Sequence, residues 1–283
     1  MITSHLPPLT GIDTHAHVFS RDLPLADGRR YSPDYDARVE DYLRQLDSVG
    51  LSHGVLVQPS FLGTDNSFLC AALRKYPQRL RAIAVVEPSI SEVQLDAMQA
   101  CGVVGIRLNL LGKPLADYSS ALWQDFFARL ARRQWQVEIQ RPMVDLAPIL
   151  PAILASGVTV VIDHFGLPEG QIDPELPAHQ AFLRLLASSP QLYIKLSAAY
   201  RCKASRAQAQ QSVSVLRSAC GGVDRFLWGS DWPHTRHEHE TDYVAQFAEI
   251  TALLPDPAER RQVLLENPAQ LFKFQQQADA TEQ

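Results

Sequence analysis

The sequence lacks the features that mark several large classes of protein. Its four cysteines are widely spaced and include no Cys-x-x-Cys pair, so neither a disulfide framework nor a zinc knuckle is indicated. No apolar run approaches the roughly 18 residues that a membrane span needs. The segment Met1–Thr10 has neither the basic start nor the apolar centre of a secretion signal. These absences predict a cytoplasmic protein without a membrane partner.

Strong charge and phosphate-binding loops are also missing. The formal net charge is -5, with 20% charged residues, and no basic patch suggests a nucleic-acid partner. Neither Gly-x-Gly-x-x-Gly nor Gly-x-x-x-x-Gly-Lys occurs. An open doubly wound sheet would be expected to carry such a loop after its first strand, so that architecture is disfavoured.

The chain does have a regular alternation of short apolar strands and amphipathic helix patterns. Strands are predicted at 11–17, 54–58, 81–86, 103–108, 136–140, 158–162, 192–197 and 226–228. Helices are predicted at 37–49, 66–76, 92–100, 120–132, 146–155, 181–187, from about 202 to 219, 241–253 and 258–274. Strands that alternate with helices form parallel sheets.

Eight such units favour an α/β fold of the closed (β/α)8 TIM-barrel type. This barrel needs about 250 residues as one unit, and no change of composition marks a linker. We therefore expect one domain over residues 1–283, with the barrel at about 11–274 and a frayed tail at 275–283.

Two histidines stand one residue apart at the end of the first predicted strand. Side chains alternate along a strand, so His15 and His17 are expected on one face, together with Asp13. Two adjacent imidazoles can bind a metal, or polarise an oxygen without one. This pair is the first candidate for a functional site.

Polar residues also lie at the ends of nearly all the remaining predicted strands. In a TIM barrel the strands end at the active-site face, and polar groups there are costly unless they are paired or used. A pair such as Glu87 with Lys195 can explain a few of them, and a glutamate partner would keep Lys195 charged and inert. The full set is His15, His17, Ser60, Glu87, Arg107, Asn109, Glu138, Gln140, His164, Lys195, Ser197 and Asp231.

Five short strings, on the second, fourth, sixth, seventh and eighth predicted strands, resemble the amidohydrolase superfamily with its metal-dependent-hydrolase-like barrel, and within it the lactonase branch of the 2-pyrone-4,6-dicarboxylate hydrolases. They are Val57-Gln58-Pro59-Ser60, Gly105-Ile106-Arg107, Ile162-Asp163-His164-Phe165-Gly166, Lys195-Leu196-Ser197 and Trp228-Gly229-Ser230-Asp231-Trp232-Pro233. Each string is weak alone, but their order along the chain from Gly11 to about Phe274 makes the resemblance specific.

The resemblance implies a hydrolase that opens a lactone of a small carboxylated metabolite, from aromatic catabolism or from a sugar acid. Asp231 would be the general base for water, and His15, His17 and His164 would surround the substrate carbonyl. Anionic groups of the substrate would be held by guanidinium groups, which fit carboxylates in pairs of hydrogen bonds. The implied substrate-binding residues are Arg107, Arg201, Ser60, Tyr31, Lys113 and Gln140.

The sequence also departs from the family pattern. Metal-dependent members use a lysine or glutamate after strand four and a histidine after strand five, where this chain has Arg107 and Gln140. We therefore expect no metal. Lys113, Leu167 and Gln140 stand where the dicarboxylate hydrolase has additional cations and a tyrosine, which suggests a smaller or less charged substrate.

Two other readings stay open. One is a mononuclear metal-dependent amidohydrolase or decarboxylase, with one zinc or manganese ion on His15, His17, His164 and Asp231. The other is a barrel that binds an acidic metabolite without turning it over. Against the second stands Asp231, because a buried carboxylate does not help to bind an anion.

Overall fold

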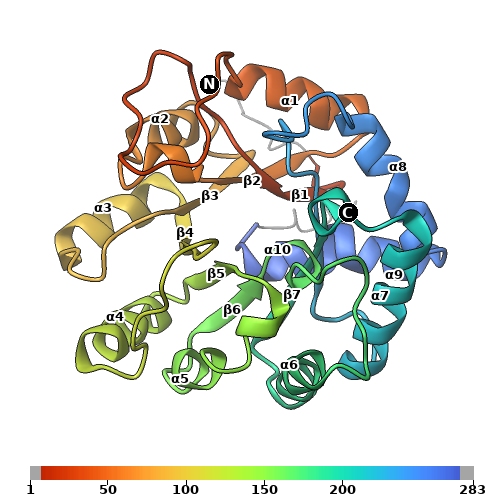
Figure 1. The fold of residues 1–283 in the computed structure, drawn as a ribbon. Coiled ribbons are helices and arrows are strands. Elements are labelled where there is room, and N and C mark those ends of the chain that lie inside the picture. The colour runs from red at the N-terminus through yellow and green to blue at the C-terminus, as the bar shows by residue number, and fades with distance from the viewer. Residues whose placement is uncertain (1–7, 275–283) are drawn as a thin grey trace, which may run out of the picture.

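The computed structural model describes residues 8–274, so the expectation of a frayed tail at 275–283 lies outside the described residues. Within them, eight parallel strands form one sheet in the order of the sequence. The strands are β1 (Ile12–Ala16), β2 (His53–Val57), β3 (Leu80–Ala84), β4 (Val103–Asn109), β5 (Gln136–Gln140), β6 (Thr159–Ile162), β7 (Leu192–Ser197) and β8 (Phe226–Gly229). The strands surround a common centre, and the helices lie around the outside (Figure 1).

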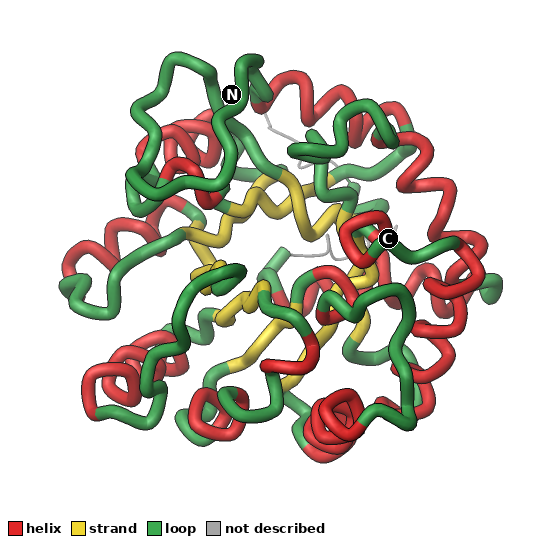
Figure 2. The backbone as a smooth tube through the Cα atoms, in the orientation of Figure 1, coloured by secondary structure: helices red, strands yellow, loops and turns green. Residues whose placement is uncertain are grey.

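The helices that follow the strands form the outer layer, as Figure 2 shows in red around the yellow strands. They are α1 (Val39–Ser48), α2 (Ser67–Lys75), α3 (Glu92–Cys101), α4 (Ala121–Arg132), α5 (Leu150–Leu154), α6 (Pro177–Ser188), α7 (Arg206–Cys220) and α8 (Tyr243–Leu253). Two short helices follow, α9 (Pro257–Arg261) and α10 (Asn267–Leu271), and α10 packs against β1 and β8. Short 3-10 turns follow four of the strands: η1 (Ser60–Leu62), η2 (Met143–Asp145), η3 (His164–Gly166) and η4 (Ala199–Cys202). The (β/α)8 barrel predicted from the alternation is confirmed.

Three predicted helices differ in extent. The helix expected at 146–155 is reduced to α5, after the turn η2. Helix α6 begins four residues earlier than predicted, because Pro177 is compatible with the first turn, where no N–H is needed. The segment expected as one helix at 258–274 is α9, a wide π turn (Gln262–Glu266) and α10. Pro268 lacks the N–H that a continuous helix would use there.

The core has two parts. A large apolar cluster fills the space between the strands and the helices. A smaller one fills the amino-terminal half of the barrel interior, with Ile12, Val55, Val161 and Leu227 from four strands and Phe272 from the end of the chain. The carboxyl-terminal half of the interior is polar and holds Glu138 and Lys195, both fully buried. Polar groups are therefore concentrated at one end of the barrel.

No helix within residues 8–274 is long and apolar enough to cross a membrane.

Candidate active site

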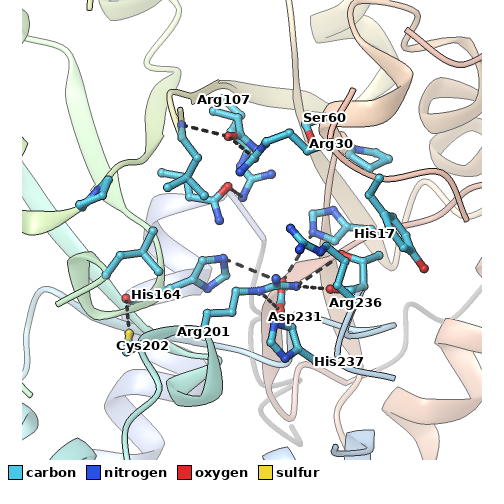
Figure 3. A pocket seen from close by; sticks show the side chains of 18 of the residues that line it. His17, Arg30, Ser60, Arg107, His164, Arg201, Cys202, Asp231, Arg236 and His237 are labelled. Atoms are coloured by element: carbon cyan, nitrogen blue, oxygen red, sulfur yellow. Dashed lines mark hydrogen bonds and ion pairs between the residues drawn. The ribbon is translucent and has the colours of Figure 1, made fainter. Parts of the chain in front are cut away.

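A cavity of about 380 Å³ opens at the carboxyl-terminal ends of the strands. His17, His164 and Asp231 lie at its floor, and Arg107 and Arg201 stand on its walls (Figure 3). This is the end of a TIM barrel at which active sites are built. The cavity is large enough for a small metabolite.

Residues of the cavity floor also take part in closing the barrel between β1 and β8. The backbone N–H of Asp231 donates to the carbonyl of His15 at 2.8 Å, and that of His17 donates to the carbonyl of Trp232 at 2.7 Å. The approach is close, because a Cβ on Gly229 would lie 2.5 Å from the Cβ of His15. Closure of the barrel thus brings Asp231 against both histidines, which are more than 200 residues away in the sequence.

The three predicted histidines surround one oxygen of Asp231. Its Oδ1 lies 3.7 Å from Nε2 of His15, 3.7 Å from Nε2 of His17 and 3.9 Å from Nε2 of His164. Asp231 Oδ1 and the Nε2 atoms of His15 and His164 are buried without a hydrogen-bond partner. Buried polar atoms without partners are costly, so their grouping points to a site for oxygen atoms of a ligand or water.

The other oxygen of Asp231 is held by the chain itself. Nε of Arg201 lies 2.6 Å from Oδ2, and the hydroxyl of Tyr200 donates to the same oxygen. Burial alone would raise the pKa of Asp231, but the charge of the Arg201 guanidinium opposes burial most strongly, and the pKa lies well below its ordinary value. Asp231 is therefore ionised at neutral pH, with Oδ1 free to accept a proton.

The imidazoles of His15 and His164 are neutral at the same pH. Burial lowers the pKa of His15 well below 6.5, and the Lys195 ammonium lowers it further. Burial also lowers the pKa of His164 to about 4. The Nδ1 atom of His164 lies 2.9 Å from the hydroxyl of Ser197, which fixes the orientation of the ring. Neutral rings beside an ionised carboxylate are a suitable arrangement for moving a proton.

A buried ionic network supports the floor of the cavity. Nζ of Lys195 lies 2.6 Å from Glu138 and 3.5 Å from Asp163, and Nε of Arg107 donates to Asp163 at 3.1 Å. The suggested pairing of Lys195 with Glu87 is wrong, because β3 ends at Ala84 and Glu87 is exposed beyond it. The expectation that a glutamate holds Lys195 is confirmed, with Glu138 in that role.

Asp13 does not share the face of the two histidines. Its carboxylate accepts bonds from Ser230, at 2.9 Å from the backbone N–H and 2.6 Å from the hydroxyl, and from Tyr243 of the outer helix α8 at 3.1 Å. The pairing of β1 with β2 shifts register between Asp13 and Ala16, which breaks the alternation on which the prediction rested. Asp13 instead anchors β1 to the segment after β8.

Arginines dominate the mouth of the cavity. Besides Arg107 and Arg201, it is lined by Arg30 and Arg236 (Figure 3). Among the described residues, neither Arg30 nor Arg236 has a carboxylate within ion-pair distance; Arg30 bonds only the amide oxygen of Asn109, at 3.2 Å. Burial and the neighbouring arginines lower the pKa of Arg30. This excess of positive charge, in a chain of net charge -5, suits an anionic ligand.

Two loops carry these mouth arginines. Tyr31 and Tyr35, in the loop after β1, donate to the carboxylate of Glu238 at 2.6 and 2.8 Å. Glu238 lies in the loop after β8, two residues beyond Arg236. The contact thus joins the loop of Arg30 to the loop of Arg236 over the cavity.

The structure brings most of the remaining predicted site residues to this cavity. Ser60, Tyr31 and Gln140 line it, and Oε1 of Gln140 accepts from Arg107 at 3.0 Å. Lys113 is exposed and does not line it, so the expectation that it binds substrate is not supported by its position.

Comparison with known proteins places the chain in a family. The sequence profile of the amidohydrolase family matches residues 12–274. The chain belongs to the amidohydrolase family. Among its relatives, the 2-pyrone-4,6-dicarboxylate hydrolase of Comamonas testosteroni is 28% identical over 94% of this chain and 90% of that protein. The 4-sulfomuconolactone hydrolase of Rhizobium radiobacter is 31% identical over 92% of this chain and 89% of its own.

A solved structure is similar over nearly the whole amidohydrolase barrel. It is that of a probable 2-pyrone-4,6-dicarboxylic acid hydrolase from Acinetobacter baumannii with citric acid bound. The two chains are 39% identical, with a TM-score of 0.89, and the match covers 93% of this chain and 99% of that one. The superfamily resemblance inferred from the strand-end strings is confirmed.

Many amidohydrolases use metal ions, so the fit of this site to a metal matters. Two buried groups have ligand atoms within 4.8 Å of one another: His15 with His17 and Asp231, and His15 with Asp163 and His164. These atom types suit zinc or manganese. Their surroundings do not, because the Lys195 ammonium lies 3.1 Å from Nδ1 of His15 and Arg201 occupies the second oxygen of Asp231. The site therefore fits a divalent cation poorly.

Three residues of this amidohydrolase site were not predicted from the sequence. Arg30 and Arg236 lie in irregular loops where no periodicity points to the cavity, and Tyr200 was not among the predicted site residues. A usable signal for Tyr200 was its place directly after β7, where strand-end side chains reach the site.

Proposed function

We propose that this amidohydrolase hydrolyses the ester bond of a small anionic lactone with water activated by Asp231. The arrangement of the three imidazole Nε2 atoms at 3.7 to 3.9 Å around the unpartnered Oδ1 of Asp231 carries the proposal. A base beside several ring nitrogens is what addition of water to a carbonyl requires. The names of the two curated relatives, both lactone hydrolases, point to the same reaction class.

The chemistry proceeds in two steps. Asp231 Oδ1 takes a proton from water as the water oxygen bonds to the lactone carbonyl carbon, and the carbonyl oxygen becomes an oxyanion held by imidazole donors. The carbonyl then re-forms and the bond to the ring oxygen breaks. That oxygen takes the proton from Asp231, which leaves the open acid and restores the carboxylate.

The cations of the cavity support an anionic substrate. Arg107 and Arg201 each use part of their guanidinium on Asp163 or Asp231, and both still line the cavity. Their remaining donors suit a carboxylate or a sulfonate on the lactone. The bound citric acid of the Acinetobacter baumannii protein and the names of the relatives agree with an acidic substrate. We infer that no metal is bound, since three cationic side chains contact the residues that would be its ligands: Lys195 contacts His15, Arg107 contacts Asp163 and Arg201 contacts Asp231.

The test is a panel of pyrone, muconolactone and sugar-acid lactones, assayed with and without a chelator alongside elemental analysis. We expect ring opening of at least one anionic lactone, with activity retained after chelation and substoichiometric metal. Failure to open any of them would contradict the hydrolase. Activity that chelation removes and zinc or manganese restores would instead favour the mononuclear metal-dependent reading.

A further inference from the structure

The two histidines of the His-x-His pair have chemically opposite partners on their Nδ1 atoms. Nδ1 of His17 lies 2.7 Å from the backbone carbonyl oxygen of Val57. A carbonyl oxygen can only accept a hydrogen bond, so Nδ1 of His17 carries a proton. In the neutral ring, Nε2 of His17 therefore presents a lone pair to the cavity.

Nδ1 of His15 faces an ammonium instead. Nζ of Lys195 lies 3.1 Å away, and an ammonium can only donate. Nδ1 of His15 must then carry the lone pair. Since burial keeps this ring neutral, its proton is on Nε2, which points toward Asp231.

Asp163 is the competing partner, because its Oδ1 lies 3.3 Å from Nδ1 of His15. The surroundings of Lys195 decide between the two. Its Nζ has three groups nearby: Glu138 at 2.6 Å, His15 at 3.1 Å and Asp163 at 3.5 Å. A lone pair on Nδ1 of His15 gives the ammonium a second hydrogen-bond acceptor beside Glu138, whereas a proton there would face the ammonium at 3.1 Å and leave Glu138 as its only hydrogen-bond acceptor among the described residues.

We infer that Lys195 fixes His15 in the Nε2–H tautomer while Val57 fixes His17 in the Nδ1–H tautomer, so that the pair offers one donor and one acceptor to the reaction. The inference deepens the proposed function and rests on it for its chemical meaning. His15 then donates a hydrogen bond to the oxyanion. His17 accepts a hydrogen bond from the second O–H group of the attacking water and so orients that water toward Asp231.

Lys195 is in this account a positioning residue. It is fully buried and does not line the cavity, so it acts on the substrate only through His15. The same contact withholds the lone pair of His15 Nε2, which a metal ion would need.

The test compares two variants that each break the same buried ion pair. Lys195→Met removes the donor, and Nδ1 of His15 is then free to carry a proton and donate to Asp163. Glu138→Gln breaks the pair but keeps the donor. Long-range proton–nitrogen NMR of protein labelled with 15N-histidine reports each tautomer, with His15→Gln and His17→Gln used to assign the signals.

We expect Nε2–H on His15 and Nδ1–H on His17 in the wild type and in Glu138→Gln, and Nδ1–H on His15 in Lys195→Met. Lys195→Met should also lower kcat by about 100- to 1,000-fold, the usual effect of losing one oxyanion donor, with little change in KM. Zinc binding, measured by calorimetry, should tighten in Lys195→Met alone.

Nδ1–H on His15 in the wild type, or an unchanged tautomer in Lys195→Met, overturns the inference. The NMR readout needs no turnover. If no lactone is hydrolysed but the tautomers are as expected, the proposed function fails and the tautomer assignment stands.

Discussion

Removing the charge of either mouth arginine should weaken the binding of an anionic lactone and leave its chemistry unchanged. Arg30 and Arg236 line the cavity and have no carboxylate partner within ion-pair distance among the described residues. We expect Arg30→Gln and Arg236→Gln each to raise KM and to leave kcat within twofold, because interactions with the unreacting part of a substrate contribute equally before and during the reaction.

The size of the expected rise in KM follows from the exposure of Arg30 and Arg236 to solvent. Two unit charges about 4 Å apart attract by about 1 kcal/mol in water and about 4 kcal/mol near a protein surface. Both arginines are exposed, so we take about 1 to 2 kcal/mol, which is a roughly 5- to 30-fold rise in KM. The rise should be smaller at high salt, because ions screen exposed charges.

Arg29 provides the matched control. It lies next to Arg30 on the same loop, but its guanidinium bonds Ser32 and the carbonyl of Ala26 and does not line the cavity. Initial rates of ring opening, followed by acid release at low and high salt, give KM and kcat for all three variants. If Arg30→Gln and Arg236→Gln match Arg29→Gln, or lower kcat with KM unchanged, the assignment of the mouth to substrate binding is refuted.

Three further outcomes are expected. Tyr200→Phe removes one donor from Asp231 Oδ2 and should lower kcat by up to about tenfold, the value of one hydrogen bond; a fall above 1,000-fold would assign Tyr200 a direct role. The rate should hold as pH falls from 7 to about 5 and drop near pH 4, where His164 gains a proton and pairs with Asp231; loss of rate already at pH 6 contradicts this. Burial lowers the pKa of His53 from 6.5 to about 4. Unfolding below pH 6.5 therefore takes up a proton at this residue, and the free energy of unfolding falls as the pH drops through 6.5. Urea unfolding at pH 7 and pH 4.5 should show that this loss is about 2 to 3 kcal/mol smaller in His53→Gln than in the wild type.

The barrel and the floor of its site could be predicted because both depend on short-range patterns. Nearly every apolar strand has a polar residue at or just after its end. Parallel strands bring those ends together, which placed His15, His17, His164 and Asp231 correctly in one cluster. The resemblance of the strand-end strings to a known family then supplied the reaction class.

The errors came where a long-range detail decides the outcome. The register shift in β1 turned Asp13 away from the histidines, and alternation along a single strand cannot reveal such a shift. Lys195 pairs with Glu138 and not with Glu87, because β3 ends at Ala84 and Glu87 lies beyond the barrel interior.

The residues at the mouth of the cavity could not be predicted from the sequence either. The departures at Leu167 and Gln140 suggested a less charged substrate, yet Arg30 and Arg236 supply positive charge from two other loops. These loops have no periodic pattern, and the contacts of Tyr31 and Tyr35 with Glu238 that join them span more than 200 residues.

The central claim, that Asp231 activates water to open an anionic lactone, is tested most directly with isotopically labelled water. In water enriched in 18O, the wild-type protein should yield a ring-opened acid that carries one 18O atom in its new carboxylate. The rate should fall by about 100- to 10,000-fold in Asp231→Asn, as expected for loss of a general base. A product without 18O, or labelled product formed at the wild-type rate by Asp231→Asn, would contradict the account.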